Sequence, residues 1–83
     1  MTSEQQLREL RGTRIKIENK FGGVYTGITG SFKMVGSRKK VALAKPCIYR
    51  TVDGVSYPYT DINHPTRWFY IDDITILETN TVG

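Results

Sequence analysis

Apolar and polar residues alternate along much of this chain, a pattern typical of β-strands. In "TRIKIEN", residues 13–19, Ile15 and Ile17 fall on one face and the charged residues between them on the other. Alternation of this kind predicts a strand that is buried on one side. Before it, Leu7 and Leu10 stand three residues apart in a polar segment, which predicts a short helix over residues 3–11.

Thr2 or Ser3 is placed to cap that helix, with a glutamine three residues further on as the partner in a capping box. A helix of two turns is marginal alone, so we expect its leucines to pack on the rest of the fold.

Further strands follow, separated by turns rich in glycine. The segment "GGVYTGITGSF", residues 22–32, is apolar and aromatic but holds several glycines, and we interpret Gly27 and Gly30 as points where a strongly curved strand bends. Residues 41–49 form the next predicted strand, in which Pro46 belongs at a bulge, an end or a free edge. Asp53-Gly54 predicts a two-residue hairpin turn between short extended arms, where Pro58 and Pro65 limit the pairing. Residues 67–78 then predict two short strands around an Asp72-Asp73 break.

One helix and about five strands fit a mainly-β fold. We predict a single domain over residues 1–83: the helix at 3–11, a small, strongly bent, five-stranded SH3-like barrel at 13–78, and a loose tail at 79–83.

Positive charge is concentrated in the first part of the chain. The net charge is +4, but residues 1–50 carry 11 Lys/Arg and 3 Asp/Glu, whereas residues 51–83 carry 1 Lys/Arg and 5 Asp/Glu. A basic half indicates an anionic partner such as nucleic acid. Contact between the basic and acidic surfaces of neighbouring copies explains the same asymmetry, and the sequence does not decide between them.

Catalytic and metal-binding patterns are weak. The chain has one histidine, His64, in a turn context, and one cysteine, Cys47, in an apolar strand, and its carboxylates lack metal-ligand spacing. We therefore expect neither an enzyme nor a cofactor or metal. A polar N-terminal segment without a signal peptide, the single cysteine and the lack of a long apolar run predict a cytoplasmic protein without a membrane partner.

Two segments resemble the Sm/LSm-like (Hfq-like) family. "LRGTRIKIENKFGGVYTGITGSF", residues 10–32, is similar to the family's helix, first strand, glycine turn and second strand. "FYIDDITIL", residues 69–77, is similar to its closing pair of short strands. Together with the order of elements, the resemblance covers residues 3–78. It implies a barrel whose two closing strands pair between neighbouring subunits of a homo-oligomeric ring.

The family's RNA-binding motif residues are not reproduced. Lys33 stands where the family has an aspartate, Ser37 where it has an asparagine, and Ile71-Asp72 where it has Arg-Gly or Lys-His. The family's uridine site is therefore not carried over. Residues 36–40, "GSRKK", predict a second turn with a basic tip. The predicted nucleic-acid contacts are the polar and cationic residues in and beside this turn, namely Lys33, Ser37, Arg38, Lys39 and Lys40.

Both closing strands are apolar and lack the Lys or Pro that discourages edge pairing. The predicted oligomer interface comprises Trp68, Phe69, Tyr70, Ile74 and Ile76. The favoured function is a non-catalytic ring that binds RNA or other nucleic acid. The alternatives are a structural or protein-interaction ring that does not bind RNA, and a monomeric SH3-like or OB-like adaptor.

Overall fold

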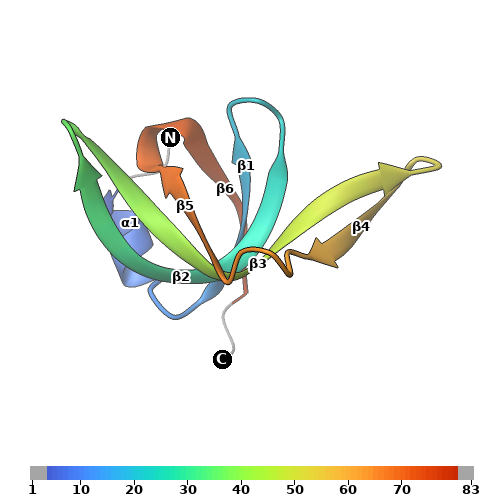
Figure 1. Ribbon diagram of the computed structural model, residues 1–83, viewed down its shortest axis with the longest axis horizontal. Coiled ribbons are helices and arrows are strands. Elements are labelled where there is room, and N and C mark those ends of the chain that lie inside the picture. Colours follow the sequence, from blue (N-terminus) through green and yellow to red (C-terminus); the bar gives the residue numbers. More distant parts are fainter. Residues whose placement is uncertain (1–3, 81–83) are drawn as a thin grey trace.

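A single antiparallel sheet dominates the computed structural model, which describes residues 4–80 (Figure 1). The predicted mainly-β fold is confirmed. The elements, in chain order, are α1 (Glu4–Glu9), β1 (Arg14–Asn19), β2 (Val24–Val35), β3 (Arg38–Val52), β4 (Val55–Thr60), β5 (Thr66–Tyr70), the short 3-10 helix η1 (Ile71–Asp73) and β6 (Ile74–Asn80).

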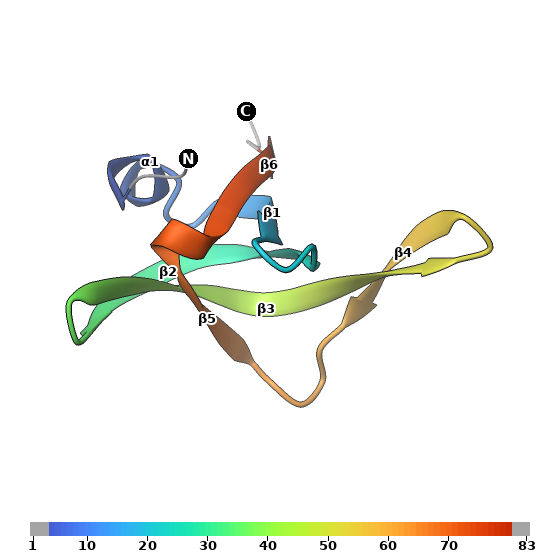
Figure 2. The same ribbon diagram turned by 90° about the horizontal axis from the view of Figure 1, so that it is seen from above.

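Strand β3 organises the sheet because its 15 residues serve three neighbours. The strand order is β4-β3-β2-β1-β6, and β5 also pairs with β3. Along the edge of β3 that faces away from β2, residues 40–44 pair with β5 and residues 47–52 pair with β4. The far end of β3 and strand β4, residues 48–60, therefore leave the rest of the sheet as a projecting hairpin, here called the arm (Figure 2).

The core lies where α1, β1, β3 and the η1–β6 segment meet. Its buried side chains are Leu7, Ile15, Ile17, Val41, Leu43, Ile71 and Ile74. The expected packing of the helix is confirmed, because Leu7 is fully buried and Leu10 contacts the same cluster. The alternation in β1 is also confirmed, since Ile15 and Ile17 share the buried face.

The pairing of β2 with β3 is irregular at two places. Thr26 pairs with Cys47 and Ile28 with Ala44, so one residue of β2 faces two residues of β3, Lys45 and Pro46. Lys45 has a φ of 49°, in the left-handed region, as expected of a bulge. Of the three positions predicted for Pro46, a bulge, a strand end or a free edge, the structure shows the bulge. A second shift in pairing occurs between Thr29 and Phe32, around Gly30.

Several predicted boundaries differ from the structure. Residues 4–80 hold six strands instead of about five, because residues 55–60 form β4 as a full partner of β3. Helix α1 spans Glu4–Glu9, within the predicted 3–11, and its predicted cap at Thr2 or Ser3 lies outside the described residues. Thr79 and Asn80, predicted as tail, continue β6 because they pair with β1.

Among the described residues the sheet is not closed, so the predicted five-stranded barrel is not confirmed. Within residues 4–80, β5 pairs with β3 and β6 with β1, and no ladder joins β5 to β6. Each of these strands therefore keeps one free edge. The described part of the chain contains no helix long and apolar enough to cross a membrane.

Candidate functional site

The predicted cationic residues gather at the β2–β3 hairpin, but most of them lie in strands. Only Gly36 and Ser37 form the turn, and Ser37 is exposed. Lys33 belongs to β2, whereas Arg38, Lys39 and Lys40 open β3. The prediction of a turn with a basic tip is wrong in this respect, since the ladder continues to the pair Val35–Arg38. Side chains in a strand alternate between faces, so Arg38 and Lys40 share one face and Lys39 takes the other.

Two aromatic side chains of β5 lie beneath these cations. The Nζ atom of Lys33 is 4.4 Å from the centre of the Trp68 ring. Arg38 and Lys40 both lie over Tyr70, at 3.9 Å and 4.5 Å from the ring centre. The strand register explains why Lys40 lies over Tyr70, because Lys40 pairs with Lys33 in β2 and with Tyr70 in β5. We call Lys33, Arg38, Lys40, Trp68 and Tyr70 the cation–aromatic face.

Acidic residues partly neutralise the cluster. The guanidinium of Arg38 donates to Asp73 at 2.9 Å and lies 3.9 Å from Asp72. Lys20 lies 3.5 Å from the same Asp73. The acidic pair of the predicted strand break thus holds Arg38, a contact between residues 35 positions apart in sequence.

Lys39 is engaged on the other face of β3. Its Nζ donates to the Glu4 carboxylate at 2.5 Å. That hydrogen bond, together with the one from Arg8, holds the pKa of Glu4 below its ordinary value. Two of the four predicted cations, Arg38 and Lys39, are therefore in ion pairs. Within residues 4–80, Lys33 and Lys40 have aromatic neighbours but no ion pair.

The predicted interface residues divide into surface and core. Trp68 is exposed, and Tyr70 is half-buried on the cation–aromatic face. Phe69 packs against the core, with its ring 5.1 Å from that of Tyr25. Ile74 is buried in the core, and Ile76 packs against it. The free edges of β5 and β6 consequently offer a neighbour mainly backbone groups, because most of these side chains already contact their own chain.

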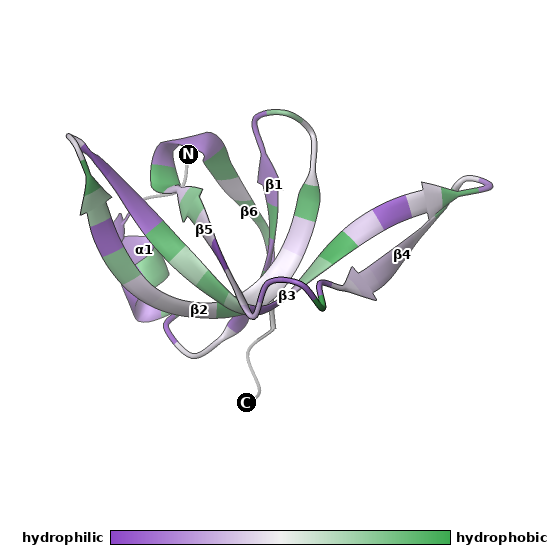
Figure 3. Cartoon of the chain, in the orientation of Figure 1, coloured by the Kyte–Doolittle hydropathy of each residue, from purple (hydrophilic) through white to green (hydrophobic). Residues whose placement is uncertain are grey.

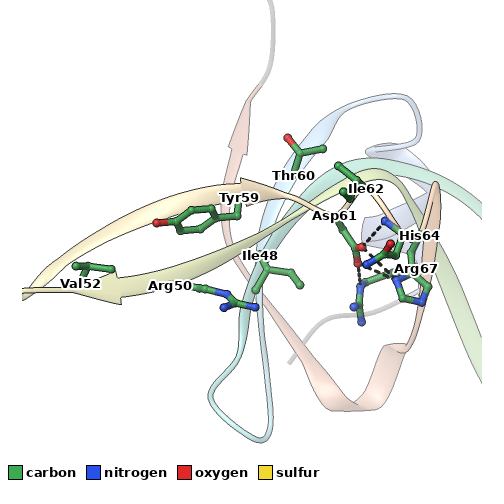
Figure 4. Close-up of a pocket in the computed structure, with 10 residues that line it drawn as sticks. Ile48, Arg50, Val52, Tyr59, Thr60, Asp61, Ile62, His64 and Arg67 are labelled. Atoms are coloured by element: carbon green, nitrogen blue, oxygen red, sulfur yellow. Dashed lines mark hydrogen bonds and ion pairs between the residues drawn. The ribbon is translucent and has the colours of Figure 1, made fainter.

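A second cluster, which sequence reasoning missed, lies at the base of the arm (Figure 4). The Asp61 carboxylate accepts hydrogen bonds from Arg67 at 2.6 Å and from the backbone N–H of Asn63 at 3.1 Å, and His64 Nδ1 lies 3.1 Å away. The Arg67 guanidinium is the main reason that the pKa of Asp61 falls to about 2. An aspartate side chain often accepts a hydrogen bond from the backbone N–H two residues later and so closes a turn. The sequence Asp61-Ile62-Asn63-His64 was therefore the signal from which this cluster could have been predicted.

This cluster orders the loop between β4 and β5. Backbone hydrogen bonds join Asp61 to Pro46 and Lys45 to Pro65, at 3.0 Å each, and fix both ends of the loop to the bulge in β3. Beside the loop lies a groove of about 520 Å³, lined partly by the arm and partly by Ile62, His64 and Arg67. His64 is exposed, and Cys47 is a half-buried free thiol. Among the described residues, no three His, Cys, Asp or Glu side chains are grouped to hold a metal.

Comparison with family models, with curated proteins and with solved structures finds no match to this chain. The similarity to the Sm-like family therefore stays a prediction from motifs and element order. Function has to be inferred from the two surfaces described above, the cation–aromatic face and the groove beside the arm.

Proposed function

We propose that this protein is a non-catalytic, Sm-like, ring-forming protein that binds RNA or other nucleic acid. The observation that carries the proposal is the placement of Lys33 on Trp68 and of Lys40 on Tyr70. Cationic side chains bind the phosphates of a nucleic acid, and its unpaired bases stack on aromatic rings. This face presents both kinds of group side by side on neighbouring strands.

Single-stranded nucleic acid fits this face better than a duplex. Trp68 is 37% exposed, so this side chain can be reached from solvent. In a duplex the bases are stacked on each other, so their faces are not available to the rings of Trp68 and Tyr70. Lys33 in β2 pairs with Lys40 in β3, so the two side chains supply neighbouring positive charges for the phosphate backbone of the nucleic acid.

The strand order supports the Sm-like assignment. Without β4, the order is β6-β1-β2-β3-β5, with a helix before β1 and a tight turn between β5 and β6. That arrangement leaves the last two strands at the two ends of the sheet. In the proposal the arm is an insertion between the third and fourth strands of the barrel, and neighbouring subunits complete the closure that one chain lacks.

The free edges support ring assembly. Strands β5 and β6 contain no Pro or Lys, so neighbouring copies meet no obvious barrier to pairing there. One edge of each copy binds the other edge of the next copy, and such head-to-tail contacts close into a ring when the rotation per subunit permits. Repetition of the cation–aromatic face around a ring raises the avidity for a long strand.

The test is a titration of a single-stranded oligoribonucleotide over a range of salt concentrations. The variant Lys33→Ala/Lys40→Ala is expected to bind more weakly and to lower the slope of log K against log salt by about 0.7 for each phosphate that is no longer bound. The control, Arg11→Ala/Arg14→Ala, removes the same charge elsewhere and leaves most of the slope. Equally weakened RNA binding in both variants would show that the affinity depends on net charge alone and not on Lys33 and Lys40.

A structural or protein-interaction ring is the second candidate, favoured by the ion pairs of Arg38 with Asp73 and of Lys39 with Glu4. These pairs neutralise half of the predicted cationic cluster. Under this alternative the protein assembles but the wild type has no affinity for RNA at low salt. A monomer in solution would instead favour the adaptor.

A further inference from the structure

The core-side face of the sheet continues onto the arm, beyond the core itself. A row of paired residues crosses four strands: Ile17 faces Tyr25, Tyr25 faces Ile48, and Ile48 faces Tyr59. The first member is fully buried, whereas Tyr59 is 48% exposed. Apolar bands recur along β3 from the centre of the sheet into the arm (Figure 3).

The arm presents an apolar face that residues 4–80 of its own chain leave uncovered. The pairs Arg50–Tyr57 and Val52–Val55 lie on the same face as Ile48 and Tyr59, because residues two apart in a strand share a face. Every residue of β4 is exposed, although Val55, Tyr57 and Tyr59 alternate as they would in a half-buried strand. A two-stranded hairpin is marginally stable in water, and an apolar face of this kind is typical of an interaction surface.

Pro58 hinders strand pairing at the outer edge of β4, so a partner is more readily accommodated on the face of the arm. Asp53 and Gly54 have φ angles of 51° and 79°, the conformation of a two-residue type I′ turn. In such a hairpin Val52–Val55 is a hydrogen-bonded pair, and bonded and non-bonded pairs then alternate. The Tyr49–Pro58 pair is therefore non-bonded, so the proline nitrogen, which has no hydrogen, points to the free edge.

Strand β6 carries the features that complement this face. Between Lys16–Glu78 and Ile17–Ile76 the pairing with β1 skips Leu77, which is 46% exposed. Glu78 is the only charged residue of β6. In the part of the chain that the structure describes, Glu78 has no ion pair, and neither has Arg50 of the arm.

We propose that the groove beside the arm receives residues 77–79 of β6 from a second copy of this chain. The inference rests on the ring assembly proposed above and adds the arm to that interface. The five ladders among residues 4–80 are all antiparallel, and antiparallel pairing of β6 with the β5 of a neighbour runs β6 from the Tyr70 end of β5 toward Thr66. Strand β6 is two residues longer than β5, so its end extends past Thr66 toward the loop that holds Ile62 and His64.

Size and charge favour this occupant. The groove is lined by Ile48, Val52, Tyr59 and the 88% exposed Ile62, which together suit a leucine side chain. Its charged side chains are Arg50, Arg67 and Asp61, with His64 beside them, so cations outnumber the single carboxylate. Because Arg67 already binds Asp61, Arg50 remains to pair with Glu78 of the neighbour.

The first test reverses the two charges. Arg50→Glu and Glu78→Arg are each expected to weaken assembly roughly 2- to 10-fold per interface, read as a lower mass by light scattering at a fixed concentration. The double variant Arg50→Glu/Glu78→Arg restores the pair in reverse and is expected to assemble like the wild type. Misfolding of the single variants cannot mimic this rescue. A double variant weaker than both single variants overturns the proposal.

The second test locates the contact by cross-linking. In a Cys47→Ser background, Ile62→Cys with Leu77→Cys is expected to form disulfide-linked multimers on oxidation. Thr51→Cys with Leu77→Cys is the control, since Thr51 lies on the opposite face of the arm. A ring that forms normally but gives equal cross-linking in both variants overturns the groove and leaves the ring intact. A monomeric wild type overturns both proposals.

Discussion

Gly27 lies against Leu43 so closely that a β-carbon built on the glycine would stand 2.7 Å from the β-carbon of Leu43. The same atom would lie 3.2 Å from the backbone oxygen of Ala44. Side chains do not approach each other to 2.7 Å, so any residue other than glycine has to push β2 away from β3 at the bulge. The glycine therefore permits close strand contact at the point where the sheet bends.

Replacing Gly27 with Ala or Val is expected to lower the free energy of unfolding by about 1–3 kcal/mol, because overpacking displaces backbone. Urea denaturation measures this change. Gly30→Ala is the matched control, since its added β-carbon would meet nothing closer than 3.5 Å. Equal losses of stability at both sites would mean that the contact with Leu43 does not set the cost.

Removing the carboxylate of Asp73 is expected to strengthen nucleic-acid binding. Asp73→Asn frees Arg38 from its 2.9 Å contact and makes a third cation available on the cation–aromatic face. Affinity for a single-stranded oligoribonucleotide and its salt dependence should both rise. Asp53→Asn removes the same charge at the tip of the arm and serves as control. If both variants gain equally, Arg38 has no particular role in binding.

A charged residue on the free edge of β6 is expected to reduce the oligomeric mass without unfolding the protein. Thr75 is exposed, and β6 pairs only with β1 in the described chain, so Thr75→Lys leaves the core unchanged and places a lysine where a neighbouring strand would pair. Sedimentation velocity gives the mass, and a thermal melt reports on folding. Thr51→Lys, on the arm, is the comparison. An unchanged mass in Thr75→Lys would contradict pairing at this edge.

Asp61 should make the protein sensitive to acid. Its pKa in the folded state is about 2, lowered mainly by Arg67, against an ordinary value of 3.8. A lowered pKa stabilises the folded state above the ordinary value, and this stabilisation is lost as the pH falls from about 4 to about 2. Urea midpoints at pH 6, 4 and 2.5 should converge for the wild type and Asp61→Asn as the solution becomes acidic. Parallel curves would show that Asp61 does not contribute.

Local patterns in the sequence predicted the local structure well. Ile15 and Ile17 share a buried face, Asp53-Gly54 turns a hairpin, and Pro46 sits at a bulge, because each depends on a residue's own backbone preferences or on the two-residue period of a strand. These constraints act over a few residues, so one sequence is enough to reveal them.

The extent of strands and the pairing of distant charges could not be predicted in the same way. Arg38 was placed in a turn because charged residues favour turns, yet the ladder with β2 extends to it. Its partner Asp73 comes from a segment that only the tertiary fold brings near. The length of β4 was underestimated because Pro58 argues against pairing, and it is compatible with the strand only because its nitrogen faces the free edge.

The pairing of β1 with β6 joins the two ends of the described chain, with Ile15 facing Thr79. Contacts between residues so far apart form slowly, because a long loop must close before they contribute. The β3–β4 hairpin, closed by a two-residue turn, forms within a short stretch of chain. During synthesis the arm can therefore fold early, while β1 waits for the last strand. Until then one edge of β1 is unpaired and the core lacks Ile71 and Ile74. Unpaired strand edges and exposed apolar surface make a nascent chain prone to aggregation.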